Sequence, residues 1–352
     1  MMLRRLIRRT ARLCGLLAAC APALAGPALA RGLTVATRDG LLGAAMRQVY
    51  FDPFTKDTAI PVASLTWDGR LATLQAKIGG GDAGWDLVQM PGEETLIGCT
   101  RGWLQKIDWV RLGGKSRYED RGVSDCGVGA GVFAYVLAWD RDKFQGMPTW
   151  ADFWDVAKYP GKRGLRRGAK TNLEIALLAD GVAPSDIYRT LATKDGLERA
   201  FRKLDQLKPY VVWWQTPAEA AHILGSGEVL MTSAPNIRIT DANRAEHRNF
   251  GIQWKQSLSE VSFWAIPKGN GATDAAYSLL GFVGEPQREA ALQALVPYGG
   301  LAKGANARLS QEQKAISPAT QAHLQESMPI DQTFWRDNLA KLDERFEAWL
   351  EK

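Results

Sequence analysis

Histidine and cysteine are scarce in this sequence of 352 residues, and this scarcity argues against several kinds of active site. There are three histidines, His222, His247 and His323, and none lies close to a cysteine, so a zinc site built from these residue types is not expected. The Gly-x-Ser-x-Gly and His-Glu-x-x-His motifs of hydrolases do not occur in the sequence either. We therefore expect no enzymatic activity, no cofactor and no metal site. An enzyme that uses carboxylates alone is the main alternative class.

The chain also has little excess of positive charge once its first residues are set aside. It contains 44 basic and 38 acidic residues, and five of the basic ones are Arg4, Arg5, Arg8, Arg9 and Arg12. Without these five arginines, 39 basic residues face 38 acidic ones. No strongly basic domain remains, so nucleic acid is not an expected partner.

The first thirty residues have the pattern of an export signal. The arginine-rich start is followed by an apolar stretch, Leu13–Leu29, and by Ala28-Leu29-Ala30, which suits a signal peptidase. The apolar stretch is short and interrupted by Pro and Gly, which disfavours a membrane span. We expect residues 1–30 to be removed and the mature chain to reside in the periplasm. A lipid anchor at Cys20 and a twin-arginine export route are alternatives.

Two cysteines remain beyond the signal, Cys99 and Cys126. Both stand beside a glycine in sequence typical of loops, and paired cysteines are common in oxidising compartments. We expect a disulfide between them, with two separate buried thiols as the alternative.

Short apolar runs alternate with helical patterns along the mature chain. Residues 33–36, 60–65 and 86–90 read as strands, with helical stretches between them, which indicates parallel βαβ units of the α/β class. Capping patterns at Thr149 and Thr216 mark the starts of two later helices. About 320 residues suggest two domains, but no Pro- or Ser-rich linker divides them. We therefore expect several short crossings between two lobes.

Several segments of the chain, in this order and spacing, resemble the spermidine/putrescine-binding branch of the periplasmic solute-binding proteins of ABC transporters. These segments are Gly84-Trp-Asp-Leu-Val, Val136-Leu-Ala-Trp-Asp-Arg-Asp-Lys-Phe144, Thr149-Trp-Ala-Asp-Phe-Trp154, Tyr159-Pro-Gly-Lys, Glu174-Ile-Ala-Leu-Leu-Ala-Asp-Gly181, Gly227-Glu-Val and Ala265-Ile-Pro-Lys-Gly269. The resemblance implies a two-lobed type II periplasmic-binding-protein fold, in which each lobe is a mixed sheet flanked by helices and the ligand lies in a cleft between the lobes.

On this resemblance, the first lobe comprises residues 31–138 and 265–300, the second lobe comprises residues 139–264, and the helices of residues 301–352 pack across both. The resemblance also implies a monomer that delivers a small organic solute to the permease subunits of an importer. The chain has no Gly-rich nucleotide loop of its own, as expected of a receptor.

The residues that hold polyamines in this branch are only partly present. Two acidic positions read Gly168 and Thr171, a third reads Ser262, an aromatic position reads Arg38, and a tryptophan position reads Pro235. A dication would therefore lose counter-charges. The positions expected to contact the ligand are Arg38, Asp39, Trp67, Glu93, Thr171, Asn236, Glu260, Ser262 and Tyr298.

Two classes of ligand fit this set of residues. A small nitrogen-containing solute, polyamine-like or a related amine, follows from the resemblance. The alternative is an amino-acid-like zwitterion, whose carboxylate would bind Arg38 and whose amine would bind an acid. Each residue also has an ordinary explanation: Arg38 and Asp39 as a solvated turn, Glu93 as first-turn helix acid, and Thr171 as a helix cap. Trp213 and Trp214 read as core and edge packing.

A ferric-ion receptor is a third possibility, because it shares the two-lobed design. Iron in such receptors needs clustered tyrosines. The tyrosines here are scattered, at positions 50, 118, 135, 159, 188, 210, 277 and 298. We therefore rank this function below the organic solutes.

Overall fold

The structure is a computed structural model that describes residues 31–352, apart from residues 39, 68–70 and 80–83. The expected signal of residues 1–30, with Cys20, and the candidate Asp39 lie outside the described residues. Among the described helices, none is both long enough and apolar enough to cross a bilayer.

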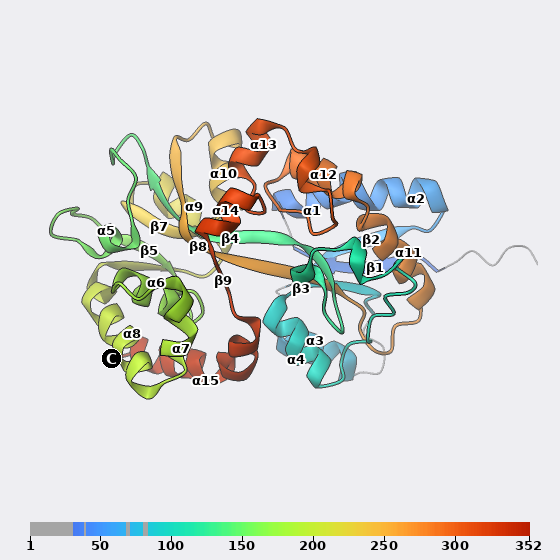
Figure 1. Ribbon diagram of the computed structural model, residues 1–352, viewed down its shortest axis with the longest axis horizontal. Helices are drawn as coiled ribbons and strands as arrows, with labels where there is room; N and C mark the ends of the chain where they lie inside the picture. The colour runs from blue at the N-terminus through green and yellow to red at the C-terminus, as the bar shows by residue number, and fades with distance from the viewer. Residues whose placement is uncertain (1–30, 39, 68–70, 80–83) are drawn as a thin grey trace, which may run out of the picture. The chain divides into compact units, whose positions relative to one another are not determined.

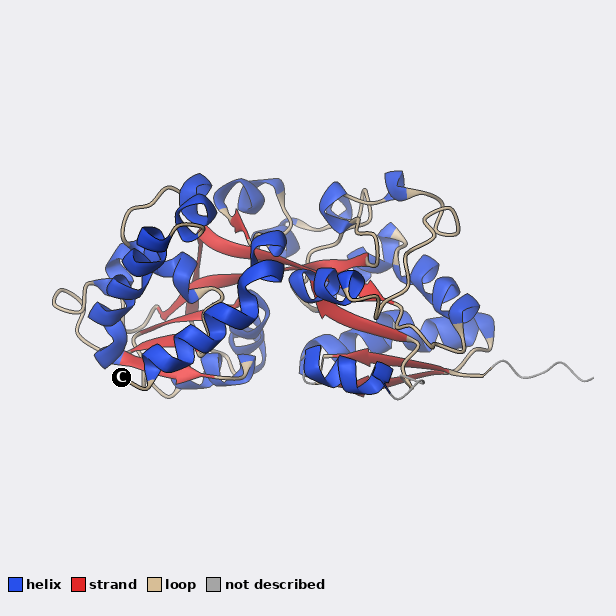
Figure 2. Ribbon diagram, turned by 90° about the horizontal axis from the view of Figure 1, so that it is seen from below, coloured by secondary structure: helices blue, strands red, loops and turns tan. Residues whose placement is uncertain are grey.

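One mixed sheet of nine strands runs through the described chain (Figures 1 and 2). The strands are β1 Leu33–Thr37, β2 Val62–Thr66, β3 Leu87–Pro91, β4 Val128–Asp140, β5 Arg163–Arg166, β6 Val211–Trp214, β7 Met231–Pro235, β8 Phe250–Ala265 and β9 Met328–Pro329. Their order is β2-β1-β3-β8-β4-β7-β5-β6, and β9 pairs with β8. The strands β1, β2 and β3 are parallel, as are β5, β6 and β7, which confirms the expected βαβ units.

The antiparallel pair β4 and β8 joins the two ends of the sheet. Near its end, β8 pairs with β3, and the second half of β4 pairs with β7. Register shifts between Gly129 and Gly131, and between Tyr135 and Leu137, bend the β4–β8 pair. We call the body built on β1–β3 the first lobe and the body built on β5–β7 the second lobe.

Each lobe has its own hydrophobic core. In the first lobe, Val35, Phe51 and Leu280 lie in one cluster. In the second, Trp139 and Leu177 belong to a separate cluster of buried side chains. Burial of two separate apolar clusters is what a chain of this length is expected to need. The two-lobed α/β fold class is confirmed, whereas the residue boundaries predicted for the lobes stay a prediction.

Helices flank the sheet in both lobes (Figure 2). They are α1 Gly40–Met46, α2 Asp52–Thr58, α3 Leu71–Gly79, α4 Gly92–Thr100, α5 Trp150–Trp154, α6 Asn172–Ala179, α7 Ile187–Leu191, α8 Lys194–Leu207, α9 Pro217–Gly225, α10 Asn236–Ala245, α11 Thr273–Val283, α12 Pro286–Leu295, α13 Gln311–Ile316, α14 Gln321–Glu326 and α15 Gln332–Leu350. A π-helical turn, Arg47–Phe51, joins α1 to α2. The predicted caps are confirmed: Thr149 opens α5 with a capping box, and the Thr216 side chain accepts from the Glu219 N–H of α9.

The last helix, α15, ties the two lobes together at one edge. Trp335, Leu342 and Phe346 of α15 are buried, and all three belong to the second-lobe core. Its first residue, Gln332, packs against Gly92 at the start of α4 in the first lobe, so closely that a Cβ on Gly92 would lie 2.1 Å from Gln332 Cδ. Residues on α4 are therefore held near the second lobe.

Candidate ligand-binding site

The candidate residues lie where strands end. Arg38 follows β1, Trp67 follows β2, and Glu93 is the second residue of α4, directly after β3. In the second lobe, Thr171 lies between β5 and α6, and Asn236 directly follows β7. Open α/β proteins bind ligands at the carboxyl ends of their parallel strands. The fold therefore brings these residues to the edges of the sheet at which a ligand is expected.

A buried group of three charged side chains links the lobes. Lys170 Nζ lies 2.5 Å from Glu93 Oε1 and 2.8 Å from Glu260 Oε1. Lys170 precedes α6 in the second lobe, Glu93 belongs to α4 in the first, and Glu260 lies on β8 between them. Each residue is at most 4% exposed. Burial disfavours the ammonium, but the two carboxylates outweigh it, so the pKa of Lys170 is raised and the group stays charged.

The acidic side chains of this group have unused hydrogen-bonding capacity. Oε2 of Glu93 and Oε2 of Glu260 are buried and have no hydrogen-bond partner within the described part of the chain. The same is true of Oε2 of Glu94, the next residue on α4. Burial and the neighbouring Glu93 raise the pKa of Glu94 to about 8, so Glu94 is mostly protonated at neutral pH. Because buried acceptors without partners are costly, these oxygens suit a ligand that brings N–H donors.

Two guanidinium groups lie beside the acidic side chains. Arg38 is half-buried, and its charge acts on three neighbouring groups, Glu94, Tyr135 and Tyr298. Arg166, the last residue of β5, also acts on Tyr135. A planar guanidinium matches a carboxylate through two parallel hydrogen bonds. Donors for an anion and acceptors for a cation thus lie in one region.

A hydrogen-bonded network around Gln89 of β3 fixes three of the candidate residues. Gln89 Nε2 donates to the Tyr298 hydroxyl at 2.9 Å, and Gln89 Oε1 accepts from Thr37 Oγ1 at 2.9 Å. Trp67 Nε1 donates to the Gln89 carbonyl at 3.2 Å. Ser262 is hydrogen-bonded to the Tyr298 side chain. All five side chains are buried, so their positions are set by the protein rather than by solvent.

Thr171 and Asn236 are fully buried at the starts of helices but serve differently. Thr171 has φ 76° and ψ −38°, an unfavourable conformation for a β-branched residue, and its side chain does not cap α6. Asn236 accepts from the Ala134 N–H and donates to the Pro297 carbonyl, each at 2.9 Å. The capping explanation of Thr171 is therefore wrong, and Asn236 joins β4, α10 and the segment before Tyr298.

Comparison with known proteins shows to which family the chain belongs. Residues 50–321 match the model of the family described as "Bacterial extracellular solute-binding protein". The chain belongs to this family. It is 38% identical over 328 residues, 93% of each chain, to a "Gamma-aminobutyric acid-binding protein" of Pseudomonas aeruginosa.

Two solved structures are similar in sequence and fold to this solute-binding protein. One is an ABC transporter substrate-binding protein from Bradyrhizobium japonicum USDA 110, at 27% identity and a TM-score of 0.84, covering 91% of this chain and 99% of that one. The other is described as the Atu4243-GABA receptor, at 25% identity and a TM-score of 0.82, covering 91% and 98%. Neither these structures nor the P. aeruginosa relative carries the name of a polyamine receptor, so the polyamine branch expected from the sequence is not established.

The structure places the sequence-derived candidates of this solute-binding protein in three groups. Arg38, Glu93 and Glu260 lie in or beside the charged group. Trp67, Ser262 and Tyr298 belong to the Gln89 network. Thr171 and Asn236 are buried at the starts of helices. Contact of any of them with a ligand stays a prediction. Trp213 and Trp214 pack against α15 and within the core, as expected.

The sequence analysis missed several residues of the site, among them Gln89, Glu94, Tyr135, Arg166 and Lys170. Lys170 stands in the segment that we compared with an acidic segment of the polyamine receptors, and we noted only the lost acids there. The positive charge of Lys170, which lies just before the buried start of α6, was the feature of the sequence that could have pointed to this site.

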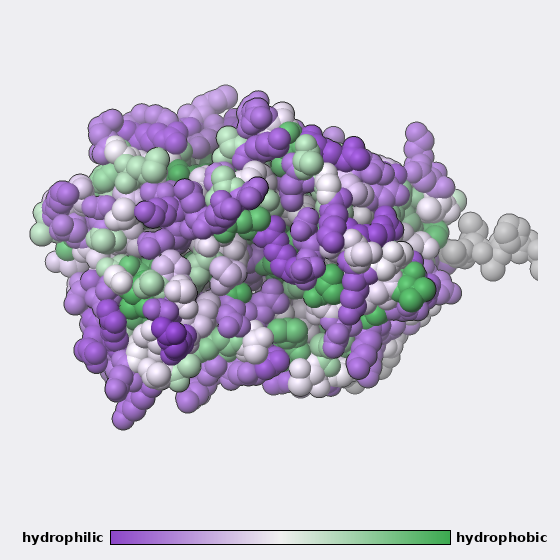
Figure 3. Space-filling model, in the orientation of Figure 1, coloured by the Kyte–Doolittle hydropathy of each residue, from purple (hydrophilic) through white to green (hydrophobic). Residues whose placement is uncertain are grey.

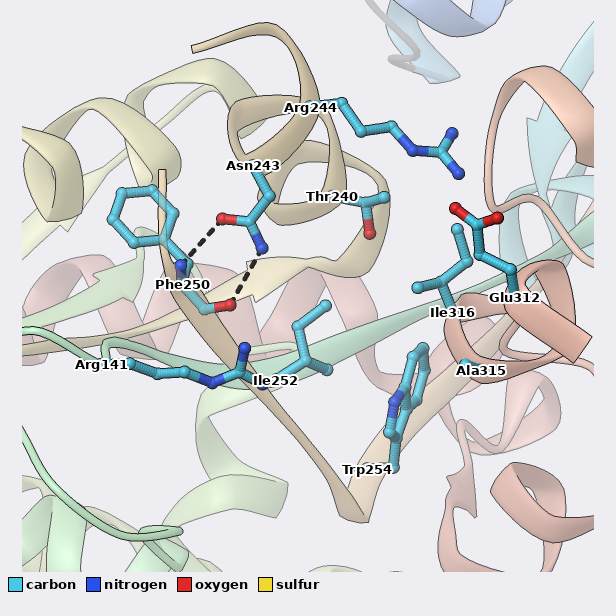
Figure 4. A pocket seen from close by; sticks show the side chains of 10 residues that line it. All are labelled: Arg141, Thr240, Asn243, Arg244, Phe250, Ile252, Trp254, Glu312, Ala315 and Ile316. Atoms are coloured by element: carbon cyan, nitrogen blue, oxygen red, sulfur yellow. Dashed lines mark hydrogen bonds between the residues drawn. The ribbon is translucent and has the colours of Figure 1, made fainter. Parts of the chain in front are cut away.

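Two hollows lie elsewhere on the solute-binding protein. A groove of about 680 Å³ is lined partly by Ser259, Val261 and Phe263 of β8, which alternate with Glu260 and Ser262 and therefore face the other side of the strand. A hollow of about 260 Å³ lies between α10, β8 and α13, where Arg244 and Glu312 point toward one another (Figure 4). No candidate residue lines either hollow.

The surface offers no large apolar area on the face in Figure 3. Hydrophilic side chains dominate this face, and apolar groups form small separate patches. The large hydrophobic residues that are exposed in the described chain, Val110, Met147 and Tyr210, are far apart in sequence. Scattered apolar residues of this kind are ordinary on soluble surfaces.

Proposed function

We propose that this protein is the periplasmic receptor of an ABC importer and that it binds an amino-acid-like zwitterion with separated amine and carboxylate groups, such as γ-aminobutyrate. The bound solute is delivered to a membrane permease. The receptor acts as a monomer, and its lobes close on the ligand.

The observation that carries this proposal is the juxtaposition of Arg38 with unused buried carboxylate oxygens. The ligand amine donates to Glu93 Oε2 and Glu260 Oε2, which have no other partner in the described chain. The ligand carboxylate accepts from the Arg38 guanidinium, whose charge already acts on the neighbouring Glu94. Both ends of the ligand thus gain charge-assisted hydrogen bonds.

The charge balance of the site supports a ligand without net charge. Three cationic side chains lie here: Arg38, Arg166 and Lys170. They interact with the carboxyl groups of Glu93, Glu260 and Asp343 and with the mostly protonated Glu94. Burying an unbalanced charge is expensive. A zwitterion keeps the balance, whereas a dication adds two uncompensated charges.

The relatives support the same class of ligand. The P. aeruginosa protein is named for γ-aminobutyrate, and at 38% identity over nearly the full chain it is similar enough for a shared ligand class to be expected. A structure at 25% identity is also described as a GABA receptor.

A polyamine-like amine is the second candidate, and the carboxyl groups of Glu93 and Glu260 favour it. The two candidates differ at one end of the ligand, where the zwitterion carries a carboxylate and the diamine an ammonium. A matched set of four-carbon compounds therefore separates them: γ-aminobutyrate, 1,4-diaminobutane, n-butylamine and butanoate.

Thermal unfolding of the mature protein with each compound tests the proposal, because a ligand that binds only the folded state raises the melting temperature. We expect γ-aminobutyrate to raise it most, with little effect of the amine or the carboxylate alone. A larger shift with 1,4-diaminobutane would favour the polyamine-like reading, and no shift with any compound would exclude both.

A further inference from the structure

Lys170 is held in place by an unusually well-fixed segment. Gly168 has φ 137° and Thr171 has φ 76°, so the chain on both sides of Lys170 is in conformations that L-residues rarely adopt. Helix α15 supports the segment, because Asp343 Oδ1 accepts from the Ala169 N–H at 2.9 Å. Backbone strain of this kind persists only where the surroundings enforce it, and here it directs Lys170 inward.

The Lys170 ammonium takes the place of an external cation. It lies between Glu93 and Glu260 at hydrogen-bond distance from one oxygen of each, with the three side chains 5%, 3% and 2% exposed. An amine group of a ligand would make the same contacts with the same two carboxylates. The protein therefore supplies from its own chain one of the ammonium groups that this pair of acids can accommodate.

The remaining capacity of the acid pair suits one further ammonium. Glu93 and Glu260 bring two carboxyl groups together, and Lys170 supplies one ammonium between them. Only their Oε2 atoms stay without partners within the described residues. With Lys170 in place, a second ligand ammonium would meet a site without a free carboxylate, which costs desolvation without return.

We propose that Lys170 is a specificity-determining residue that fills, as an internal ammonium, the second cation position of the Glu93–Glu260 pair and thereby excludes diamines in favour of solutes with a single amine. This inference rests on the proposed function, since it assumes that the ligand lies at this acid pair. It also explains how a chain that resembles polyamine receptors can reject their ligands.

A buried ion pair that serves only folding would predict a different result. In that case, loss of Lys170 would lower stability and weaken every ligand alike. An internal ammonium predicts a change in preference, because its removal leaves two uncompensated carboxylates that a diamine can neutralise. Ligand preference, and not stability, is therefore the informative measurement.

Calorimetric titration of four proteins with γ-aminobutyrate and 1,4-diaminobutane tests the inference. The proteins are the wild type, Lys170→Arg, Lys170→Met and the double variant Lys170→Met/Glu260→Gln. We expect Lys170→Met to bind 1,4-diaminobutane at least about tenfold more tightly than the wild type does. Lys170→Arg keeps the charge, and the double variant restores a single uncompensated acid, so both should still reject the diamine.

The folding of Lys170→Met provides a second measurement if the free variant is unstable. Addition of 1,4-diaminobutane should then raise its folded fraction in circular dichroism, because the ligand replaces the missing cation. An unchanged diamine affinity in a folded Lys170→Met, no recovery of an unfolded one, or diamine binding by the double variant would each overturn the inference.

Failure of the proposed function would look different. The wild type would then not bind γ-aminobutyrate, whereas a gain of diamine binding in Lys170→Met would still support the role of Lys170. Binding of γ-aminobutyrate by the wild type without any gain in Lys170→Met would refute the inference alone.

Discussion

Replacing Arg38 with alanine should remove most of the affinity for an amino-acid-like zwitterion. Arg38 lies at the carboxyl end of β1, half-buried, and its charge reaches Glu94, Tyr135 and Tyr298. A ligand carboxylate at this position would lose its charge-assisted hydrogen bonds and would stay buried without a counter-charge. Losses of this kind cost about 2–4 kcal/mol, which corresponds to an increase of the dissociation constant by roughly 30- to 700-fold.

Titration calorimetry with γ-aminobutyrate measures this loss directly. Arg38→Lys should recover little affinity, because a point charge replaces a planar fork. Arg47→Ala is the matched control, since Arg47 is exposed and donates only to the Ser64 hydroxyl in the described structure; its affinity should equal that of the wild type. If Arg38→Ala binds as tightly as the wild type, Arg38 lies outside the binding site and the carboxylate end of the proposal is wrong.

Three further variants test the chemistry around the site. Glu94 keeps its proton to about pH 8 in the folded protein but ionises near pH 4.5 in the unfolded chain. The free energy of unfolding should therefore fall as the pH rises from about 5 to 8. In urea titrations at several pH values, Glu94→Gln should show a weaker dependence of this free energy on pH. Cys126→Ser should lower the free energy of unfolding by about 3–4 kcal/mol for a disulfide at a sequence separation of 27, and mass spectrometry after alkylation without reduction should find no free thiol in the wild type. Gly131→Ala would place a Cβ 2.3 Å from the Tyr298 ring at φ 152°, so we expect a loss of about 1–3 kcal/mol in stability together with weaker ligand binding; unchanged melting and affinity would show that the ring can move aside freely.

Strands β1, β2 and β3 and the long apolar strand β4, expected over residues 131–139, could be predicted from the sequence, whereas β5, β6 and most of β8 could not. β1 covers residues 33–37 where 33–36 were expected, because its apolar run is bounded by polar residues. β8 extends over residues 250–265, whereas the sequence indicates a strand only over residues 261–267. Its middle reads Lys255-Gln-Ser-Leu-Ser-Glu260, which is too polar to indicate a buried strand. Lys255 is exposed and Gln256 half-buried, whereas residues 257–260 are all buried where β8 passes from one lobe to the other, and that passage is a property of the tertiary fold.

The charged site shows the same limit. Glu93 and Glu260 were recognised as candidates from their places after a strand and before Ser262. Their meeting through Lys170 joins residues 77 and 90 positions apart in the sequence. The charge gained at Lys170 is a local signal, but no local pattern encodes its contact with Glu93 and Glu260. The disulfide between Cys99 and Cys126 was easier to foresee, because few pairings exist, and the structure contains it.

The most direct test of the account is a calorimetric comparison of γ-aminobutyrate and 1,4-diaminobutane on the wild-type mature protein at neutral pH. The two ligands share the four-carbon spacing and one ammonium, and they differ in whether the other end is a carboxylate or a second ammonium. A site that contains Arg38 and an acid pair in which Lys170 already occupies one of two ammonium positions predicts saturable binding of γ-aminobutyrate and at least about tenfold weaker binding of the diamine. Tighter binding of 1,4-diaminobutane would contradict the central claim that this receptor recognises a zwitterion.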